Sequence, residues 1–161
     1  MDKHSLVSQI IAELNNALDH ALAAAEEAHK GATHEQSKAE TQYDTLGLEH
    51  AYLAEGQARR IQELKDSITQ LHQFKPKAFN QEDPIYLGAL LKLKATADSD
   101  AKPLMWVLLA PTAGGMILEW QQRHVQIISP NSPMTKAILG LYMEDVFTLP
   151  NGLRYEISEL Y

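Results

Sequence analysis

The feature that most constrains this chain is the regular spacing of apolar side chains near its amino terminus. From residue 7 to residue 32 these side chains follow alternating steps of four and three, the heptad spacing with which one helix packs along another. The positions are Val7, Ile11, Leu14, Leu18, Ala21, Ala25, Ala28 and Ala32. The pattern therefore predicts a long helix with a helical partner. We expect Ser5 to cap the start of this helix.

A second heptad seam predicts the partner helix, which we expect to begin between Glu40 and Leu46. Its positions are Ala54, Gln57, Ile61, Leu64, Ile68 and Leu71. In an antiparallel hairpin the small residues of both seams would face each other near the connecting segment, and the large residues would face each other at the far end. Alanine would then let the helices approach more closely toward the tip. We favour this hairpin, although a parallel dimer would satisfy the same heptads.

The apolar period changes to two after Pro84, which predicts strands in place of helices. We expect a hairpin over 1–75 with its tip near 31–44, a linker over 76–84 and a second domain over 85–161. In this domain the sequence predicts strands near 85–97, 104–110, 117–120, 125–129, 146–149 and 153–159. A short helix near 133–139 separates the last two strands from the others. The expected fold class is α+β, with a mostly antiparallel sheet.

Composition narrows the possible partners. The net charge is −7 and the 14 basic residues are scattered, whereas direct nucleic-acid binding depends on clustered Lys and Arg. We therefore expect contact with nucleic acid only through another protein. There is no cysteine, which excludes disulfides and thiolate metal sites. With neither a signal peptide nor an apolar span of membrane length, the expected location is the cytoplasm, away from membranes.

Residues that could suggest small-molecule chemistry have simpler interpretations. The seven histidines are dispersed, and we expect no metal held by the protein alone. Five aromatic residues are expected in the core and on the sheet face, not around a ligand: Trp106, Trp120, Tyr86, Tyr142 and Tyr155. Gly114-Gly115 lacks the lysine and helix of a phosphate-binding loop.

The last third of the chain carries the most specific motif, ISPNSPMTKAILGLYMEDVFTLPNGLRYEISEL, residues 128–160. Ser132-Pro133 predicts a helix start, with serine as cap and proline in the first turn. The order of residues resembles the carboxyl-terminal domain of the Gre transcript-cleavage factors, GreA and GreB. The matching residues are Ile128, Ser129, Ser132, Pro133, Lys136, Ala137, Ile138, Leu139, Asp145, Val146, Pro150, Gly152, Tyr155 and Ile157.

The resemblance implies an FKBP-like sheet domain and RNA polymerase as the partner. It implies polymerase binding through Ser132, Pro133, Met134 and Lys136, with Met134 exposed as an adaptable apolar contact. The helical hairpin would enter the secondary channel of a bacterial polymerase and modulate elongation or the cleavage of backtracked RNA. The expected protein is a monomer that at most stimulates the cleavage activity of the polymerase itself.

In Gre factors, acidic residues at the hairpin tip help to hold a catalytic Mg²⁺ of the polymerase, since this ion prefers oxygen ligands. Here Gly31, Glu35 and Gln36 resemble the family's tip. Ala32 stands where the family has its first acid. Glu40 and Asp44, close to Tyr43, are displaced candidates for the missing charge. The candidate catalytic residues are therefore Glu35, Glu40 and Asp44, and we expect weak or no stimulation of cleavage.

Two alternatives come from other classes of protein. The heptad seams would serve a dimeric, non-enzymatic scaffold equally well. FKBP prolyl isomerases line a pocket with aromatic residues, but the chain matches none of their pocket motifs. The sequence leaves open whether a polymerase factor of this kind stimulates cleavage, prevents arrest or inhibits.

Overall fold

The computed structural model describes the backbone of residues 2–33, 45–96 and 104–161, and the side chains of 2–30, 52–96 and 104–161. The chain forms two compact units. One unit joins Met1–Ile10 to Gln70–Tyr161, and the other contains Ile11–Thr69. These limits differ from the expected ranges 1–75 and 85–161, because the start of the first helix and the end of the second group with the sheet.

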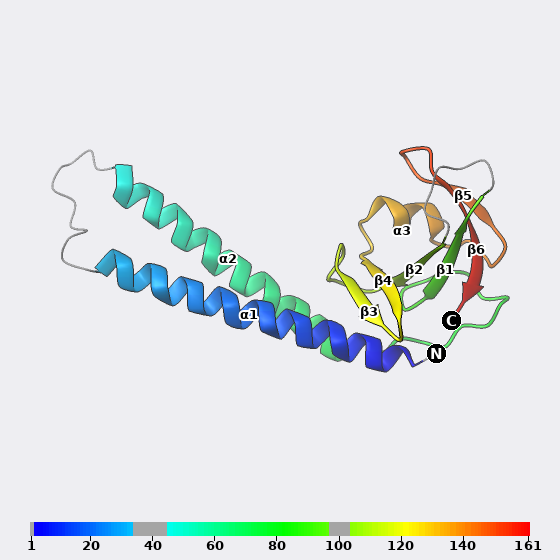
Figure 1. Cartoon of the computed structure of the whole chain (residues 1–161), viewed down its shortest axis with the longest axis horizontal. Helices are drawn as coiled ribbons and strands as arrows, with labels where there is room; N and C mark the ends of the chain where they lie inside the picture. Colours follow the sequence, from blue (N-terminus) through cyan, green and yellow to red (C-terminus); the bar gives the residue numbers. More distant parts are fainter. Residues whose placement is uncertain (1, 34–44, 97–103) are drawn as a thin grey trace. The chain divides into compact units, whose positions relative to one another are not determined.

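The helical unit is formed by α1 (Lys3–Thr33) and α2 (Thr45–Gln73), which run antiparallel in one chain (Figure 1). α2 begins within the predicted interval. Leu14 and Leu64 are buried, as the large-residue ends of the two seams require. The structure therefore has the expected intramolecular hairpin.

At the opposite end of the helical unit, the helices do not pack as closely as the alanine residues of the two seams predicted. Ala28 and Ala54 are exposed, and the side chain of Leu53 is 63% exposed. A groove of about 300 Å³ opens between the two helices there. The expected close approach is wrong because a methyl group buries little apolar area and so provides little packing free energy.

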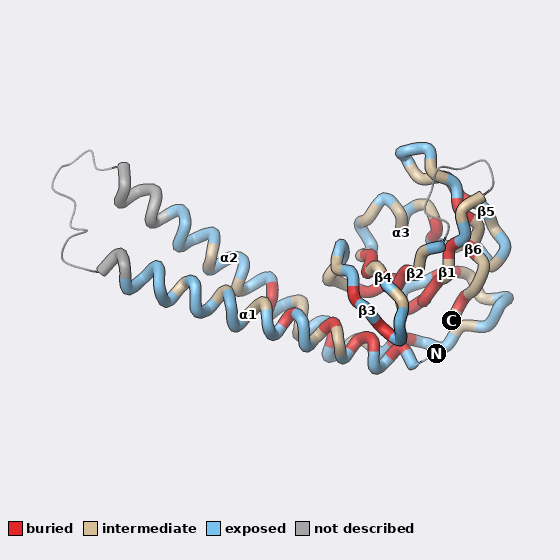
Figure 2. Tube along the Cα trace, in the orientation of Figure 1, coloured by how far each residue is buried: buried red, intermediate tan, exposed pale blue. Residues whose placement is uncertain are grey.

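The start of α1 is capped by Asp2, not by Ser5 as predicted. The Asp2 carboxylate accepts the backbone N–H groups of His4 at 3.1 Å and Ser5 at 3.2 Å, which have no partner inside the helix. The Ser5 hydroxyl instead accepts a hydrogen bond from the Trp120 indole nitrogen at 3.0 Å. Leu6 and Ile10 are fully buried, and the first turns of α1 belong to the same compact unit as the sheet (Figure 2).

The sheet unit contains six strands and one short helix. The strands are β1 (Leu90–Ala95), β2 (Leu104–Leu109), β3 (Ile117–Trp120), β4 (Arg123–Ile128), β5 (Val146–Thr148) and β6 (Arg154–Leu160), and the helix is α3 (Pro133–Ile138). Their order across the sheet is β3-β4-β2-β1-β6-β5. The pair β2 and β4 is parallel, and the other four pairs are antiparallel. This confirms the expected α+β class.

The core of the sheet unit is apolar and continuous with α3. Leu91 and Leu93 of β1, Val107 of β2, Ile157 of β6 and Ile138 of α3 are all fully buried in one cluster. Alternate residues of β1 point to this cluster, as the period of two predicts.

The aromatic residues divide between the interior and the surface. Trp106, Trp120 and Tyr155 are buried, as expected. The prediction is wrong for Tyr86 and Tyr142, which are 55% and 49% exposed.

Candidate functional site

The first turn of α3 is fixed by a short network of hydroxyl groups. Ser132 is the N-cap, and its Oγ accepts the backbone N–H of Thr135 at 3.0 Å. The buried Thr135 hydroxyl donates to the carbonyl oxygen of Ser129 at 2.7 Å. Pro133 occupies the first helical turn, where a backbone N–H would have no partner inside the helix, so proline is tolerated there. The two hydrogen bonds and the proline ring together fix the backbone from Ser129 to Thr135.

A turn before β3 packs closely against this segment. A Cβ atom added to Gly114 would lie 2.6 Å from the Oγ of Ser129, a distance that only glycine avoids. The backbone N–H of Gly115 donates to the carbonyl oxygen of Ile127 at 2.9 Å, which ties the turn to β4. Glycine at this position therefore allows the turn and the α3 entry to meet.

The turn between β5 and β6 supplies the facing wall. The backbone N–H of Gly152 donates to the carbonyl oxygen of Leu149 at 2.9 Å. The Asn151 side chain accepts the N–H of Leu153 at 3.2 Å. Asparagine favours such turns because its side-chain oxygen reaches the backbone two residues on.

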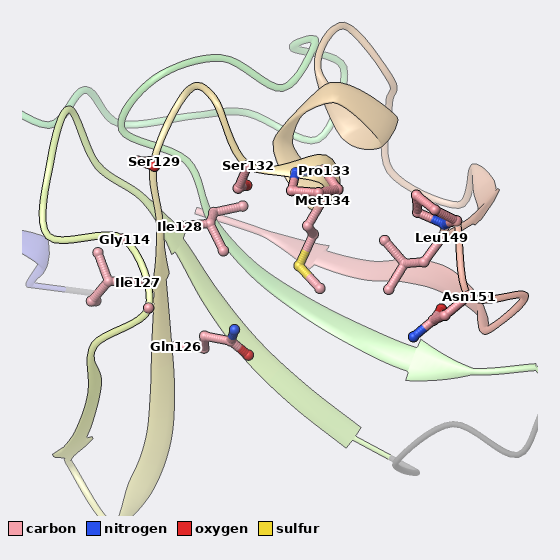
Figure 3. Close-up of a pocket in the computed structure, with 12 residues that line it drawn as sticks. Gly114, Gln126, Ile127, Ile128, Ser129, Ser132, Pro133, Met134, Leu149 and Asn151 are labelled. Carbon is pink, nitrogen blue, oxygen red and sulfur yellow. The ribbon is translucent and has the colours of Figure 1, made fainter.

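These segments enclose a pocket of about 530 Å³, which we call the α3 pocket. Its lining residues are Gly114, Gly115, Gln126, Ile127, Ile128, Ser129, Ser132, Pro133, Met134, Leu149, Pro150 and Asn151. Figure 3 shows the Met134 and Leu149 side chains pointing into the space between α3 and the turn at Asn151. Met134 is half-buried and packs against the core cluster. The expectation of an exposed Met134 is therefore corrected.

The α3 pocket has an uncharged lining. None of the lining residues carries an acid, a base or a cationic group. The wall is mainly apolar, with amide and hydroxyl groups at its edges, which is the usual character of a site that holds an apolar group by shape. A flexible methionine in such a wall can adapt to different partners.

The structure brings together three of the four residues predicted to bind a partner. Ser132, Pro133 and Met134 line the α3 pocket, with Ser132 engaged as the helix cap. Lys136 is exposed on α3 and does not line the pocket. Sequence reasoning missed the contribution of Gly114 and of the β5–β6 turn. Both carried a visible signal, the paired glycines and Pro150-Asn151-Gly152, but it indicated turns and not their proximity.

The predicted tip residues Glu35, Glu40 and Asp44 lie outside the described residues. Among the residues that the structure describes, no group of three or more His, Asp and Glu side chains could hold a metal ion. Within the same residues no helix is both long and apolar enough to cross a membrane.

The chain therefore consists of a helical hairpin and a small α+β unit with an apolar pocket. Neither a comparison with protein-family models nor a comparison with curated proteins finds a match. The chain is similar to solved structures described as the transcription factor Gfh1, at 25% identity, and as GreA factor homolog 1 (Gfh1) of Thermus thermophilus, at 22%. It is also similar to Gfh1 of Thermus aquaticus, at 23%.

These likenesses extend over most of each chain. They cover 93–94% of this chain and 92–94% of the others, with TM-scores of 0.38, 0.38 and 0.39 respectively.

Proposed function

We propose that this protein is a cytoplasmic, bacterial RNA polymerase-binding elongation factor that docks through the α3 pocket and inserts its helical hairpin into the secondary channel. The sheet unit would hold the factor on the outer surface of the polymerase. The hairpin would carry its tip toward the active site. Any cleavage of backtracked RNA would be the chemistry of the polymerase and its Mg²⁺.

The observation that carries this proposal is the convergence of two separate parts of the Gre-like motif on one pocket. Ser132, Pro133 and Met134 come from the start of α3, and Pro150 and Asn151 come from the β5–β6 turn. Ser132, Pro133 and Pro150 match the family's sequence, and Met134 and Asn151 lie beside these matches. The two segments are separated along the chain by the rest of α3 and by β5. Their meeting around an apolar space supports a docking role for this part of the chain.

The pocket is suited to an apolar side chain that projects from a partner helix. An interface of this kind gains most of its binding free energy from a few apolar anchors in desolvated pockets. Met134 lines such a pocket, and Pro133 is exposed beside it. Burying a methionine side chain contributes roughly 1.5–3 kcal/mol. Replacing Met134 with serine removes this contribution and should therefore weaken polymerase binding at least tenfold.

The test is a titration of the fluorescently labelled full chain with core RNA polymerase at low salt, comparing the unmodified protein with Met134→Ser. Met143→Ser is the matched control, because Met143 is also half-buried but does not line the α3 pocket. The control should bind like the unmodified protein. No binding of the unmodified protein at micromolar concentration would reject the proposed function.

A dimeric scaffold is a second candidate, favoured by the apolar side chains left on the helical unit. Leu22 and Leu53 are 43% and 63% exposed, whereas Leu14 is already buried inside one chain. Self-association would therefore use Leu22 and Leu53. Analytical ultracentrifugation distinguishes the candidates, because a dimer that Leu53→Asp converts to a monomer would favour the scaffold over the polymerase factor.

A further inference from the structure

A second apolar surface on the sheet unit is formed by residues that do not line the α3 pocket. Four exposed apolar side chains occur on two adjacent segments: Tyr86, Leu87, Leu139 and Tyr142, at 55%, 41%, 52% and 49% exposure. Two backbone hydrogen bonds join the segments, from Ile85 N–H to Leu141 at 2.8 Å and from Gly140 N–H to Ile85 at 2.9 Å. Exposed apolar side chains that gather in this way mark interaction sites more often than scattered ones do.

Beside Tyr86 and Leu87 the surface is hollowed into a groove of about 560 Å³, which we call the linker groove. Phe74 and Phe79 line it from the segment that follows α2. This groove is lined by a fixed backbone. A Cβ atom on Gly88 would lie 3.3 Å from both the Pro76 Cα and the Lys77 nitrogen, so the linker packs closely on the segment that precedes β1. A groove held in this way needs little reorganisation to bind a partner.

The linker groove also has a cationic edge. Lys75 and Lys77 line it and are exposed, and neither ammonium group has a carboxylate partner among the described residues. The acidic residue in the lining is Asp83, and its carboxylate accepts the backbone N–H of Asn80 at 2.7 Å. The ammonium groups of Lys75 and Lys77 therefore lie beside the aromatic and aliphatic side chains of the groove. The protein as a whole has a net charge of −7.

We propose that the linker groove is a second docking surface, which binds an acidic segment of RNA polymerase with an apolar side chain as its anchor. This inference rests on the proposed function. The anchor would lie between Phe74, Phe79 and Tyr86, and neighbouring carboxylates of the segment would pair with Lys75 and Lys77. Tyrosine and phenylalanine are typical of interface centres, and complementary charges at the rim set the rate and the salt dependence of association.

The exposed side chains beyond the groove favour a protein segment over a small ligand. Leu139 and Tyr142 are not part of the groove lining, so the apolar surface continues past the space that a small molecule would fill. A partner that covers both areas must be extended. The two lysines are too few to act as a nucleic-acid surface, which needs many phosphate contacts.

The first test measures binding of the full chain to core RNA polymerase, comparing the unmodified protein with the double variant Tyr86→Ser, Leu87→Ser. The matched control is Leu104→Ser, Ile117→Ser, which truncates two other exposed apolar side chains of the same unit, at 49% and 62% exposure. We expect the groove variant to bind at least tenfold more weakly and the control to bind within twofold of the unmodified protein. Equal affinity of groove variant and unmodified protein would overturn the inference.

A second variant guards against a folding defect, because it changes only exposed charges. Lys75→Gln, Lys77→Gln should weaken polymerase binding at low salt and flatten its dependence on salt concentration, while the thermal unfolding midpoint is unchanged. An unaltered salt dependence would overturn the cationic role. If the unmodified chain fails to bind polymerase, the proposed function falls, whereas binding that survives both groove variants rejects this second surface alone.

Discussion

Lys3 connects three parts of the sheet unit that are distant in sequence. Its ammonium group donates to the carbonyl oxygens of Lys77, Gly88 at 2.9 Å and Tyr161 at 2.8 Å. It also lies 4.8 Å from the centre of the Phe79 ring. The residue is only 5% exposed, so this cation is satisfied by backbone oxygens and an aromatic face in place of water.

Replacing Lys3 with methionine should destabilise the protein by about 2–4 kcal/mol at pH 7, because the buried carbonyl oxygens lose a charged donor. Urea unfolding followed by tryptophan fluorescence measures this change, since both tryptophans are buried. Lys94→Met is the control, because Lys94 is an exposed lysine on β1, and it should change stability by less than about 0.5 kcal/mol.

The difference in free energy of unfolding between the unmodified protein and Lys3→Met should also depend on pH. Burial lowers the pKa of the Lys3 ammonium to about 8, below the value of about 10.4 in an unfolded chain. Between these values the unfolded state binds more protons, so the free energy of unfolding should rise with pH relative to Lys3→Met. If the difference in free energy of unfolding between the two proteins stays constant from pH 7.5 to 10.5, the three hydrogen bonds to Lys3 fully compensate the lowering of its pKa by burial.

The turn between β3 and β4 holds two glutamines in a conformation that glycine prefers. Gln121 and Gln122 have φ values of 49° and 61°, between the paired residues Trp120 and Arg123, as in a two-residue hairpin turn. Gln122→Gly should therefore stabilise the protein by about 0.5–1 kcal/mol. Urea unfolding measures it. The same change at Gln81, an exposed turn residue without a positive φ, should give no gain.

At the scale of elements, α2 contains a glycine that lowers the stability of the helix. Gly56 lies inside the helix, is exposed, and an added Cβ would meet nothing within 4 Å. Gly56→Ala should raise helix stability by about 1 kcal/mol, since alanine loses less backbone entropy on folding. Thermal unfolding followed at 222 nm by circular dichroism would show a higher midpoint. Gly152→Ala is the contrasting variant, and it should lower the midpoint because Gly152 has a φ of +86°.

The elements also show how far local patterns extend. The heptads predicted both helices, and the large-residue ends of the two seams favoured the hairpin over a parallel dimer. The predicted strands near 104–110 and 117–120 match β2 and β3 closely. The size gradient of the seams did not predict their packing, because Ala28 and Ala54 stay exposed. Heptad position fixes the side of the helix on which a residue lies, whereas closure depends on how much apolar area is then buried.

At the scale of the whole molecule, the proposed function makes a prediction about RNA cleavage, because Ala32 stands where the Gre factors, which this chain resembles, carry an acid. Loss of one carboxylate from a weakly held Mg²⁺ removes charge stabilisation from the transition state. The unmodified protein should bind backtracked elongation complexes and stimulate RNA cleavage weakly or not at all. Ala32→Asp should raise the cleavage rate at unchanged binding, as measured by release of labelled RNA fragments.

If Glu40 or Asp44 supplies the acidic groups in place of Glu35, the unmodified protein should stimulate cleavage. Robust cleavage by the unmodified protein that is lost on Glu40→Ala or Asp44→Ala, but not on Glu35→Ala, would reject the alignment of Glu35 with the family's second acid. The displaced residues would then supply the charge.

By itself the sequence determined the helices, most strands, the cap at Ser132 and the α+β class, because heptad spacing, alternation and caps are properties of neighbouring residues. Only the tertiary structure decided that β2 and β4 pair in parallel, that Lys3 is buried and that Tyr86 is exposed. It also decided that Gly114, Met134 and Asn151 line one pocket. Each of these depends on segments distant in the chain, whose meeting is set by the packing of the whole core and not by any local pattern.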